Sequence, residues 1–178
     1  QLVDAVESMK VGYGIQPEAS VGPLIEEPSE KLLRALTTLD DGETWLLEPK
    51  QLDETGRLWR PGIKYGVKPG SFFQTTECFG PVLGLVRAKS LKQAIEIQNS
   101  TAYGLTAGIH SLNTTEISSW CESVDAGNLY VNRGITGAIV QRQPFGGFKR
   151  SSVGFGLKAG GPNYILQFGT FKDNQMKF

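Results

Sequence analysis

Two side chains that could bind a nucleotide stand just before a short apolar run. Glu77 and Phe79 flank Cys78, the turn dipeptide Gly80-Pro81 follows, and residues 82–86 are apolar. A carboxylate accepts two charge-assisted hydrogen bonds from a vicinal diol, and an aromatic side chain packs against a flat ring. A nucleotide ribose with its base offers both groups. The alternative is that Phe79 belongs to a hydrophobic core and that Glu77 is a solvated charge at a strand end.

A second group of candidate residues lies in the last third of the chain, where glycines are frequent. Residues 134–138 and 143–149 are loop-like, and four more glycines follow at Gly154, Gly156, Gly160 and Gly161. The backbone here is expected to bend sharply or to approach a ligand closely. A phosphate cradle is one interpretation. The Gly-x-Gly-x-x-Gly spacing is absent, so the sequence does not support a dinucleotide fingerprint.

Composition excludes several classes of function. The chain has 178 residues, with 18 lysines and arginines against 18 aspartates and glutamates, so no net field favours nucleic acid or an anionic membrane. No apolar run approaches the roughly 20 residues of a membrane span. His110 is the single histidine and no carboxylate cluster replaces a histidine set, so no metal site is expected. The length predicts one core and one domain.

The two cysteines, Cys78 and Cys121, show no Cys-x-x-Cys spacing, and both lie in segments expected to be buried. A reduced, cytoplasmic protein is the simplest interpretation. The chain begins at Gln1 without a methionine or a signal-like segment, which suggests a piece of a longer polypeptide.

The first half of the chain predicts mainly helices and loops. Residues 1–9 carry a helical apolar spacing, and residues 28–39 predict a helix that has Ser29 near its start. The packed face of that helix is expected to consist of Leu32, Leu33, Ala35, Leu36 and Leu39. Residues 45–47 predict a short strand. The charged stretch that follows, up to Gly56, predicts a surface loop, and residues 59–70 predict an irregular connection punctuated by glycine and proline.

From residue 82 the pattern is regular. Residues 82–86 predict a strand buried on both faces, and residues 105–110 and 128–132 predict two more. Ser90 with Gln93, and Asn113 with Glu116, have the spacing of helix N-caps. The second helix has an apolar stripe of Ile117, Trp120, Cys121 and Val124. Strands alternating with helices predict parallel strands in an α/β fold, and residues 164–171 predict a final strand.

Five motifs together resemble the aldehyde dehydrogenase superfamily. They are residues 21–25 (Val-Gly-Pro-Leu-Ile), 77–82 (Glu-Cys-Phe-Gly-Pro-Val), 103–108 (Tyr-Gly-Leu-Thr-Ala-Gly), 126–132 (Ala-Gly-Asn-Leu-Tyr-Val-Asn) and 144–147 (Pro-Phe-Gly-Gly). Within the superfamily, residues 132–138 and 158–162 resemble the L-glutamate γ-semialdehyde (Δ1-pyrroline-5-carboxylate) dehydrogenase module of the bifunctional proline utilization A family. The motifs keep the family's order and cover nearly the whole chain.

The resemblance implies a fold and a set of roles. The fold would be part of a three-layer α/β catalytic domain with a parallel sheet, spanning residues 1–155. Residues 156–178 would be a tail whose strand returns to the cofactor and oligomerisation region. By resemblance, Glu77 binds the nicotinamide ribose of NAD, Phe79 packs by the nicotinamide, and Phe145 walls the aldehyde pocket. Gly137 and Ala138 would present backbone N–H groups to the substrate carboxylate.

The resemblance places the family's chemistry outside this chain. A cysteine thiolate attacks the aldehyde, hydride passes to NAD, and water releases the acid. The nucleophilic cysteine and the general-base glutamate would lie upstream of Gln1, so no catalytic residue is assigned here and the fragment alone is expected to be inactive. Cys78 fills a variable slot in its motif, and Cys121 lies on a helix stripe where burial would keep it inert. The parent would oxidise glutamate γ-semialdehyde in proline catabolism, with its remaining polypeptide and further copies as partners and FAD in any separate proline dehydrogenase domain.

The sequence departs from the family's motifs at three places, and two alternative functions remain. Ala138 replaces a hydroxyl residue of some relatives, residues 141–142 (Gln-Arg) are bulky, and Ser152 replaces a common glycine. The first two bear on substrate preference. The chain could belong to an aldehyde dehydrogenase with another substrate, or could be a non-catalytic module kept for assembly.

Overall fold

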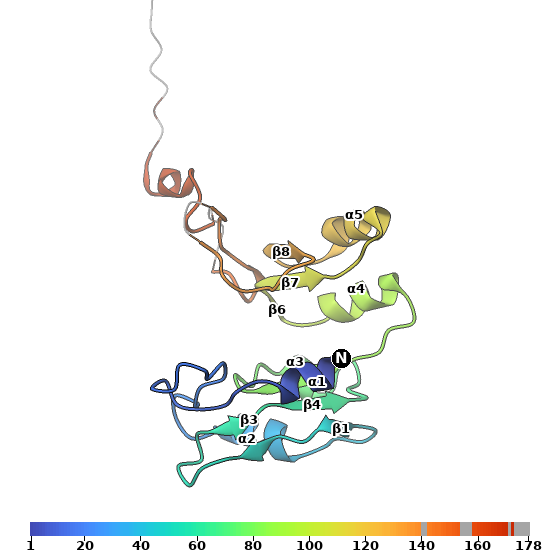
Figure 1. The fold of residues 1–178 in the computed structure, drawn as a ribbon. Coiled ribbons are helices and arrows are strands. Elements are labelled where there is room, and N and C mark those ends of the chain that lie inside the picture. The colour runs from blue at the N-terminus through green and yellow to red at the C-terminus, as the bar shows by residue number, and fades with distance from the viewer. Residues whose placement is uncertain (140–141, 154–157, 171, 173–178) are drawn as a thin grey trace, which may run out of the picture. The chain divides into compact units, whose positions relative to one another are not determined.

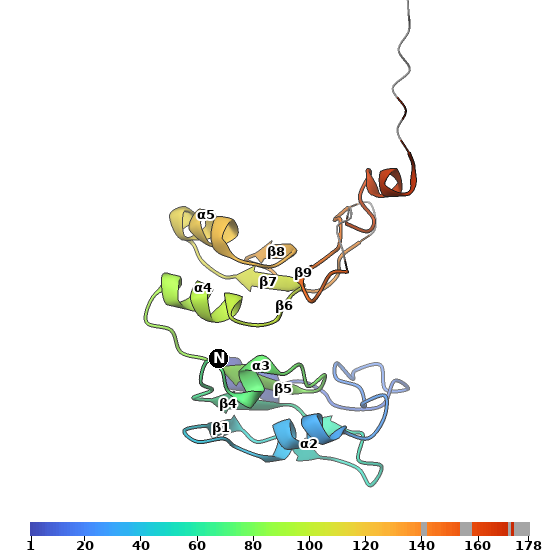
Figure 2. The ribbon, with the colours of Figure 1, turned by 180° about the vertical axis from the view of Figure 1, so that it is seen from behind.

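A computed structural model describes residues 1–139, 142–153, 158–170 and 172 of the chain. The contacts divide the chain into two compact units, Gln1–Lys89 and Ser90–Phe178 (Figures 1 and 2). Each unit has a hydrophobic cluster of its own, so the expectation of a single core is wrong. The division expected between residues 155 and 156 concerns the parent protein and stays a prediction.

The first unit contains three helices and five strands. The helices are α1 (Leu2–Glu7), α2 (Glu30–Thr37) and α3 (Phe72–Thr75), and the strands are β1 (Thr44–Leu47), β2 (Lys50–Gln51), β3 (Trp59–Arg60), β4 (Gly62–Tyr65) and β5 (Val82–Leu85). The helices expected in residues 1–9 and 28–39 are confirmed, as is the strand at residues 45–47. Only three of the five apolar positions expected to pack in α2 are buried, namely Leu32, Ala35 and Leu36. Leu33 is exposed because it lies off the face that contacts the core, and Leu39 is exposed because α2 ends at Thr37, before the next turn would bring Leu39 onto that face.

Strand β4 is the centre of the first unit's main sheet. It pairs antiparallel with β1 and parallel with β5. The expected connection at residues 59–70 is therefore wrong, since it contains both β3 and β4. The expected strand at residues 82–86 is present as β5, but it is not buried on both faces, and Leu83 is 45% exposed. Among the described strands β5 has β4 as its one neighbour, so it forms an edge.

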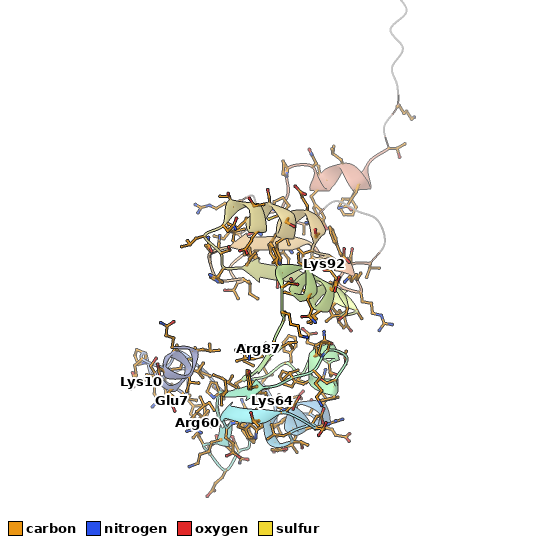
Figure 3. All side chains as sticks on the ribbon, turned by 90° about the vertical axis from the view of Figure 1, so that its right-hand side faces the viewer. Glu7, Lys10, Arg60, Lys64, Arg87 and Lys92 are labelled. Atoms are coloured by element: carbon orange, nitrogen blue, oxygen red, sulfur yellow. The ribbon has the colours of Figure 1, made fainter. Side chains whose placement is uncertain are left out.

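Lys64 explains why β4 escapes recognition from the sequence. Its side chain lies inside the first unit (Figure 3), and its Nζ is 3.2 Å from Glu43 Oε2 and 2.5 Å from the carbonyl oxygen of Thr38. The Nζ also lies 5.1 Å and 5.0 Å from the ring centroids of Trp45 and Phe73. A buried ammonium is tolerated only with such partners, and they come from distant parts of the sequence.

The core of the first unit joins α2 to the segment that carries the candidate nucleotide residues. Leu32, Ala35 and Leu36 of α2 pack with Trp59 and Cys78. Residues from α3 and β5 surround this cluster. The packing fixes the backbone immediately before β5 against α2.

The second unit contains two α-helices, four strands and a 3₁₀ helix among its described residues. They are α4 (Leu91–Asn99), β6 (Tyr103–Gly104), β7 (Thr106–Ile109), α5 (Thr114–Ser123), β8 (Asn128–Val131), β9 (Phe148–Lys149) and η1 (Tyr164–Phe168). Both predicted caps are confirmed. Ser90 Oγ accepts a hydrogen bond from the Gln93 N–H at 3.2 Å, and Asn113 Oδ1 accepts from the N–H groups of Thr115 and Glu116 at 2.9 Å and 3.3 Å.

Strands β7 and β8 pair in parallel and are joined through α5, as the sequence predicts. Ile95 of α4 and Trp120 of α5 pack with Ala107 of β7 in the second core. The Trp120 indole N–H donates to Gln98 Oε1 at 3.0 Å, which ties α5 to α4. The α/β fold is confirmed, with parallel pairs in both units and antiparallel pairs beside them.

The final strand expected at residues 164–171 is wrong, because Tyr164–Phe168 forms the 3₁₀ helix η1. The rings of Tyr164 and Phe168 meet edge to face at 5.5 Å, a contact that a helical turn allows and a strand would not. Gln141, Gly154, Gly156 and Phe171, which entered the sequence predictions, lie outside the described residues. No helix in the described part of the chain is long and apolar enough to cross a membrane.

Candidate functional site

The segment that holds Glu77 and Phe79 has a strained backbone. It runs from the end of α3 to the start of β5, and Phe79 has a φ of +59°. A bulky residue rarely adopts this left-handed conformation, and such strain is often kept at ligand sites. A Cβ at the next residue, Gly80, would collide with the Leu32 side chain of α2. The close approach of α2 therefore fixes the path of the backbone beside Phe79.

This backbone path turns both candidate side chains outward. Phe79 is 80% exposed, so its interpretation as a core residue is wrong. Lys31 Nζ donates to the carbonyl oxygen of Glu77 at 2.7 Å, which binds the segment to α2 a second time. Among the described residues no hydrogen bond or ion pair engages the Glu77 carboxylate. Its two oxygens are available to a ligand, as a diol-binding carboxylate requires.

A hollow of about 470 Å³ lies beside Phe79. Its lining comes from residues 23–27, from α2 and its N-cap, and from Cys78. Cys78 is buried, as expected, and its Sγ lies 3.6 Å from the carbonyl oxygen of Thr76. Burial raises the pKa of the Cys78 thiol, and the charges of Lys31 and Lys64 offset only part of that effect. A thiol held protonated in this way is a poor nucleophile.

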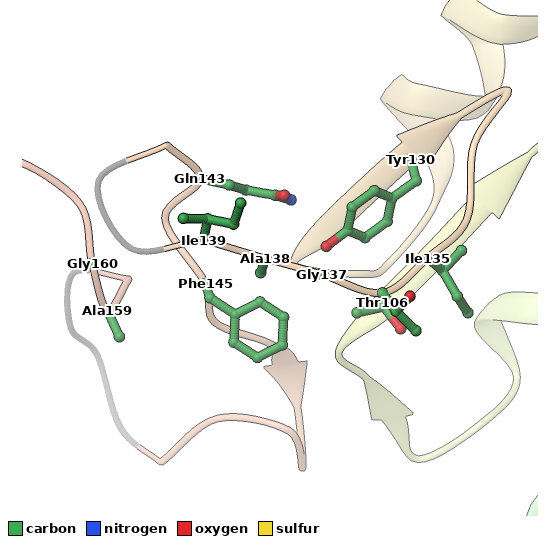
Figure 4. A pocket seen from close by; sticks show the side chains of 11 residues that line it. Thr106, Tyr130, Ile135, Gly137, Ala138, Ile139, Gln143, Phe145, Ala159 and Gly160 are labelled. Carbon is green, nitrogen blue, oxygen red and sulfur yellow. The ribbon is translucent and has the colours of Figure 1, made fainter. Parts of the chain in front are cut away.

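The second unit contains a cavity of about 540 Å³ (Figure 4). It brings together all three residues expected to bind substrate, Gly137, Ala138 and Phe145. The other lining residues are Thr106, Tyr130, Ile135, Thr136, Ile139, Gln143, Ala159 and Gly160. Glu77 and Phe79 thus share the first unit, and the substrate candidates share the second.

The loop that carries Gly137 and Ala138 offers backbone donors to the cavity. Gly137 has a φ of +83°, a conformation that glycine adopts without steric cost. Among the hydrogen bonds between described residues, none uses the N–H group of Gly137 or of Ala138. Consecutive unused N–H groups next to a positive-φ glycine can bind an anion through the backbone alone.

Phe145 is held in the cavity wall by its own backbone. Its N–H donates to the carbonyl oxygen of Ala159 at 2.8 Å, and the Ala159 N–H donates back at 3.1 Å. The next carbonyl, that of Gly146, accepts from the buried Asn128 Nδ2 at 3.0 Å. The same Nδ2 donates to the carbonyl oxygen of Leu105 at 2.9 Å. The turn at residues 144–147 is therefore anchored to β8.

Sequence reasoning missed Asn128, Tyr130 and Lys158 as parts of this site. Asn128 and Tyr130 are two residues apart on β8 and both are buried, which a half-buried strand alternation could have indicated. Lys158 donates through its Nζ to the carbonyl oxygen of Gly127, beside β8. No local pattern marks that contact, because the two residues are 31 positions apart.

Cys121 is exposed, contrary to expectation. The stripe of α5 that faces the core is narrower than the apolar spacing suggests, with Trp120 and Val124 buried and Cys121 beyond its edge. Cys121 lines neither of the two cavities described above. Among the described residues, no group of three or more His, Cys, Asp or Glu side chains is placed to hold a metal ion.

Comparison with known proteins gives one consistent family. The model of the "Aldehyde dehydrogenase family" matches residues 1–173. The 1-pyrroline-5-carboxylate dehydrogenase of Bacillus subtilis is 36% identical over 165 residues, covering 92% of this chain and 32% of that protein. The chain thus spans about a third of the length of the curated relatives it matches.

Solved structures agree with this match. Proline utilization A from Corynebacterium freiburgense superposes with a TM-score of 0.94 at 58% identity, covering 99% of this chain and 18% of that one. A 1-pyrroline-5-carboxylate dehydrogenase from Thermus with bound NAD superposes with a TM-score of 0.79 at 32% identity, covering 94% of this chain and 32% of that one.

Proposed function

Because the chain belongs to the aldehyde dehydrogenase family, we propose that it is part of an NAD-dependent enzyme that oxidises L-glutamate γ-semialdehyde to L-glutamate in proline catabolism. The observation that carries the proposal is the cavity of the second unit. It combines an aromatic wall at Phe145 with two unused N–H groups at Gly137 and Ala138. The substrate has a carboxylate at one end and an aldehyde at the other, which suits a site with fixed donors at one side.

The first unit contributes to cofactor binding in this proposal. NAD supplies the acceptor for the hydride that leaves the aldehyde carbon. The Glu77 carboxylate accepts hydrogen bonds from the nicotinamide ribose diol, and the exposed Phe79 ring packs beside the nicotinamide. Two features of the structure fit these roles: an exposed carboxylate without a partner among the described residues, and an aromatic ring presented by a strained backbone. The relative from Thermus was solved with bound NAD.

The second unit orients the substrate. The N–H groups of Gly137 and Ala138 hold the carboxylate, and Phe145 excludes water from one side of the chain that carries the aldehyde. Backbone donors need no side-chain ordering, so binding at this end costs little entropy. The nucleophilic cysteine and the general base of the parent are proposed to lie outside these 178 residues.

The proposal also covers the cellular location of the protein and the polypeptide that surrounds this chain. Cys78 and Cys121 are free thiols, which favours a reducing, cytoplasmic location. The proline utilization A relative, of which this chain covers 18%, supports a larger polypeptide around this chain. We further propose that any separate proline dehydrogenase domain of that polypeptide binds FAD, and that the protein forms homo-oligomers.

Steady-state kinetics of the full-length protein test the proposal. The panel compares L-glutamate γ-semialdehyde, succinate semialdehyde and butanal at saturating NAD. We expect the highest kcat/KM for L-glutamate γ-semialdehyde, with butanal lower by on the order of 100-fold because it leaves the carboxylate donors unpaired. A preference for succinate semialdehyde would leave the family assignment unchanged but would replace L-glutamate γ-semialdehyde as the proposed substrate. Equal values for all three would contradict a carboxylate site.

A further inference from the structure

Tyr130 has a hydroxyl whose role is unexplained by the fold. The side chain projects from β8, and the residue is 3% exposed. Its hydroxyl is buried without a hydrogen-bond partner among the described residues. Buried polar groups in native proteins are nearly always paired, and an unpaired one destabilises the fold. A phenylalanine would fill the same space without this cost, so the hydroxyl calls for a functional explanation.

Tyr130 lines the cavity that we propose holds the substrate. Tyr130 is one of the residues that line the cavity, and in Figure 4 its ring reaches from β8 toward the loop that carries Gly137 and Ala138. The side chains of Ile135, Ile139 and Phe145 in the same lining are apolar. The polar side chains of the lining are those of Tyr130, Thr106, Thr136 and Gln143. Of these, Tyr130 alone has a buried polar atom without a hydrogen-bond partner among the described residues.

The position of the ring is set by rigid structure. Tyr130 pairs with Gly108 in the parallel register of β7 and β8. The guanidinium of Arg133 lies over the ring, with its Cζ 5.2 Å from the ring centroid. A donor that is fixed by a strand loses little freedom when it binds, and the nearby cation favours an anionic ligand.

Open space borders the loop that carries Gly137 and Ala138. A Cβ at Gly134 or at Gly137 would meet no other atom within 4 Å. Both glycines thus stand beside open space. This open space borders the loop that carries the two proposed backbone donors.

We propose that Tyr130 is a specificity-determining residue, whose hydroxyl donates a hydrogen bond to a carboxylate oxygen of the substrate held at Gly137 and Ala138. This proposal rests on the proposed function. It accounts for the unpaired hydroxyl, because the partner that satisfies it is the ligand. It also adds a side-chain donor to two backbone donors, so that a carboxylate is matched on more than one side.

Two properties of Tyr130→Phe in the full-length protein test the proposal. The first is ligand binding, measured as the Kd for the product L-glutamate by calorimetry and as the KM for L-glutamate γ-semialdehyde. We expect the Kd and the KM each to rise by on the order of tenfold, the effect of one lost hydrogen bond to a charged group. The second is the thermal unfolding midpoint, which we expect to stay the same or rise. The kcat/KM for butanal should change less than about twofold, since butanal has no carboxylate.

Tyr103→Phe is the matched control. Tyr103 is an exposed tyrosine of β6 in the same unit, and it does not line the cavity. It should leave both affinity and stability unchanged. Unchanged L-glutamate affinity in Tyr130→Phe would overturn the proposal, as would a lower unfolding midpoint with equal losses for both aldehydes, which would make the hydroxyl structural. A wild-type protein without preference for carboxylated aldehydes would overturn the proposed function itself, and this assignment with it.

Discussion

Two residues of the candidate sites, Phe79 and Gly137, have left-handed backbone conformations. Phe79 and Gly137 both have positive φ, at +59° and +83°, but only one of them is a glycine. The left-handed conformation costs a non-glycine residue about 1–2 kcal/mol. At Phe79 the cost is offset by the packing of Gly80 on α2 and by the hydrogen bond from Lys31. At Gly137 the residue type removes the cost, and the open space around it shows that packing does not require glycine there.

Substitutions at Gly137 separate a backbone effect from a steric one. Gly137→Val should raise KM for L-glutamate γ-semialdehyde, because a β-branched residue resists positive φ and moves the N–H groups. Gly137→Asn is the control, since asparagine tolerates the left-handed conformation, and it should lose much less. The kcat/KM for butanal should fall little in either variant. An equal loss for both aldehydes in Gly137→Val would mean that the residue serves only as a turn glycine.

Glu77→Gln tests the proposed ribose contact. The amide keeps the size of the side chain and loses the charged acceptor, so each affected hydrogen bond should weaken by at most about 1.5–3 kcal/mol. We expect KM for NAD to rise and the unfolding midpoint to stay constant, because the Glu77 carboxylate has no partner among the described residues. Unchanged kinetics in NAD would remove Glu77 from the cofactor site.

Secondary-structure elements explain which parts of the fold a sequence can predict. The helices α4 and α5 are found correctly, because Ser90 and Asn113 cap them through contacts two or three residues away. Strand β4 is missed, because Lys64 reads as a surface residue until Glu43, 21 positions away, is placed beside it. The 3₁₀ helix η1 is missed for a similar reason, since apolar residues without a clear period fit a strand equally well.

Strand β8 anchors two other backbone segments through the side chain of Asn128. Its Nδ2 donates to two carbonyls, those of Leu105 and Gly146. Asn128→Ala would remove both bonds. The Leu105 carbonyl oxygen would keep the hydrogen bond from the backbone N–H of residue 128 at 3.0 Å, but the Gly146 carbonyl oxygen would lose its partner, so we expect a loss of about 2 kcal/mol in stability and a lower thermal unfolding midpoint. Asn99→Ala is the comparison, because Asn99 also bridges backbone groups of the second unit but is not fully buried, and it should cost less. Equal midpoints for Asn128→Ala and wild type would show that the turn at residues 144–147 is held by other contacts.

At the scale of the whole molecule, the candidate residues form two sets, one in each compact unit. The cofactor candidates Glu77 and Phe79 belong to Gln1–Lys89, and the substrate candidates Gly137, Ala138 and Phe145 belong to Ser90–Phe178. The sequence motifs group the same residues, and Gly137, Ala138 and Phe145 line one cavity; the roles of both sets stay predictions. The alternation of β8 could have indicated that Asn128 and Tyr130 are buried, but their contacts with the second set depend on strand packing, which the motifs do not contain. The chain spans 32% of a curated relative, so the site is proposed to be completed by other parts of the polypeptide.

Neither cysteine of this chain is expected to serve as the nucleophile of the whole protein. Cys78 is buried and its raised pKa keeps the thiol protonated at neutral pH, and Cys121 lines neither cavity. Cys78→Ala and Cys121→Ala in the full-length protein should therefore retain kcat close to wild type. Loss of turnover in Cys121→Ala, with the unfolding midpoint unchanged, would place the covalent step inside this chain.

Amide hydrogen exchange of the full-length protein tests most directly whether the cavity of the second unit is the substrate site. The measurement compares peptides across the whole protein with and without saturating L-glutamate, and it repeats the comparison in Gly137→Val. We predict slower exchange in wild type at the amides of Gly137 and Ala138, because they become hydrogen-bond donors to the carboxylate, and a smaller effect in the variant. Bound L-glutamate that slows exchange elsewhere and leaves these two amides unchanged would contradict the account.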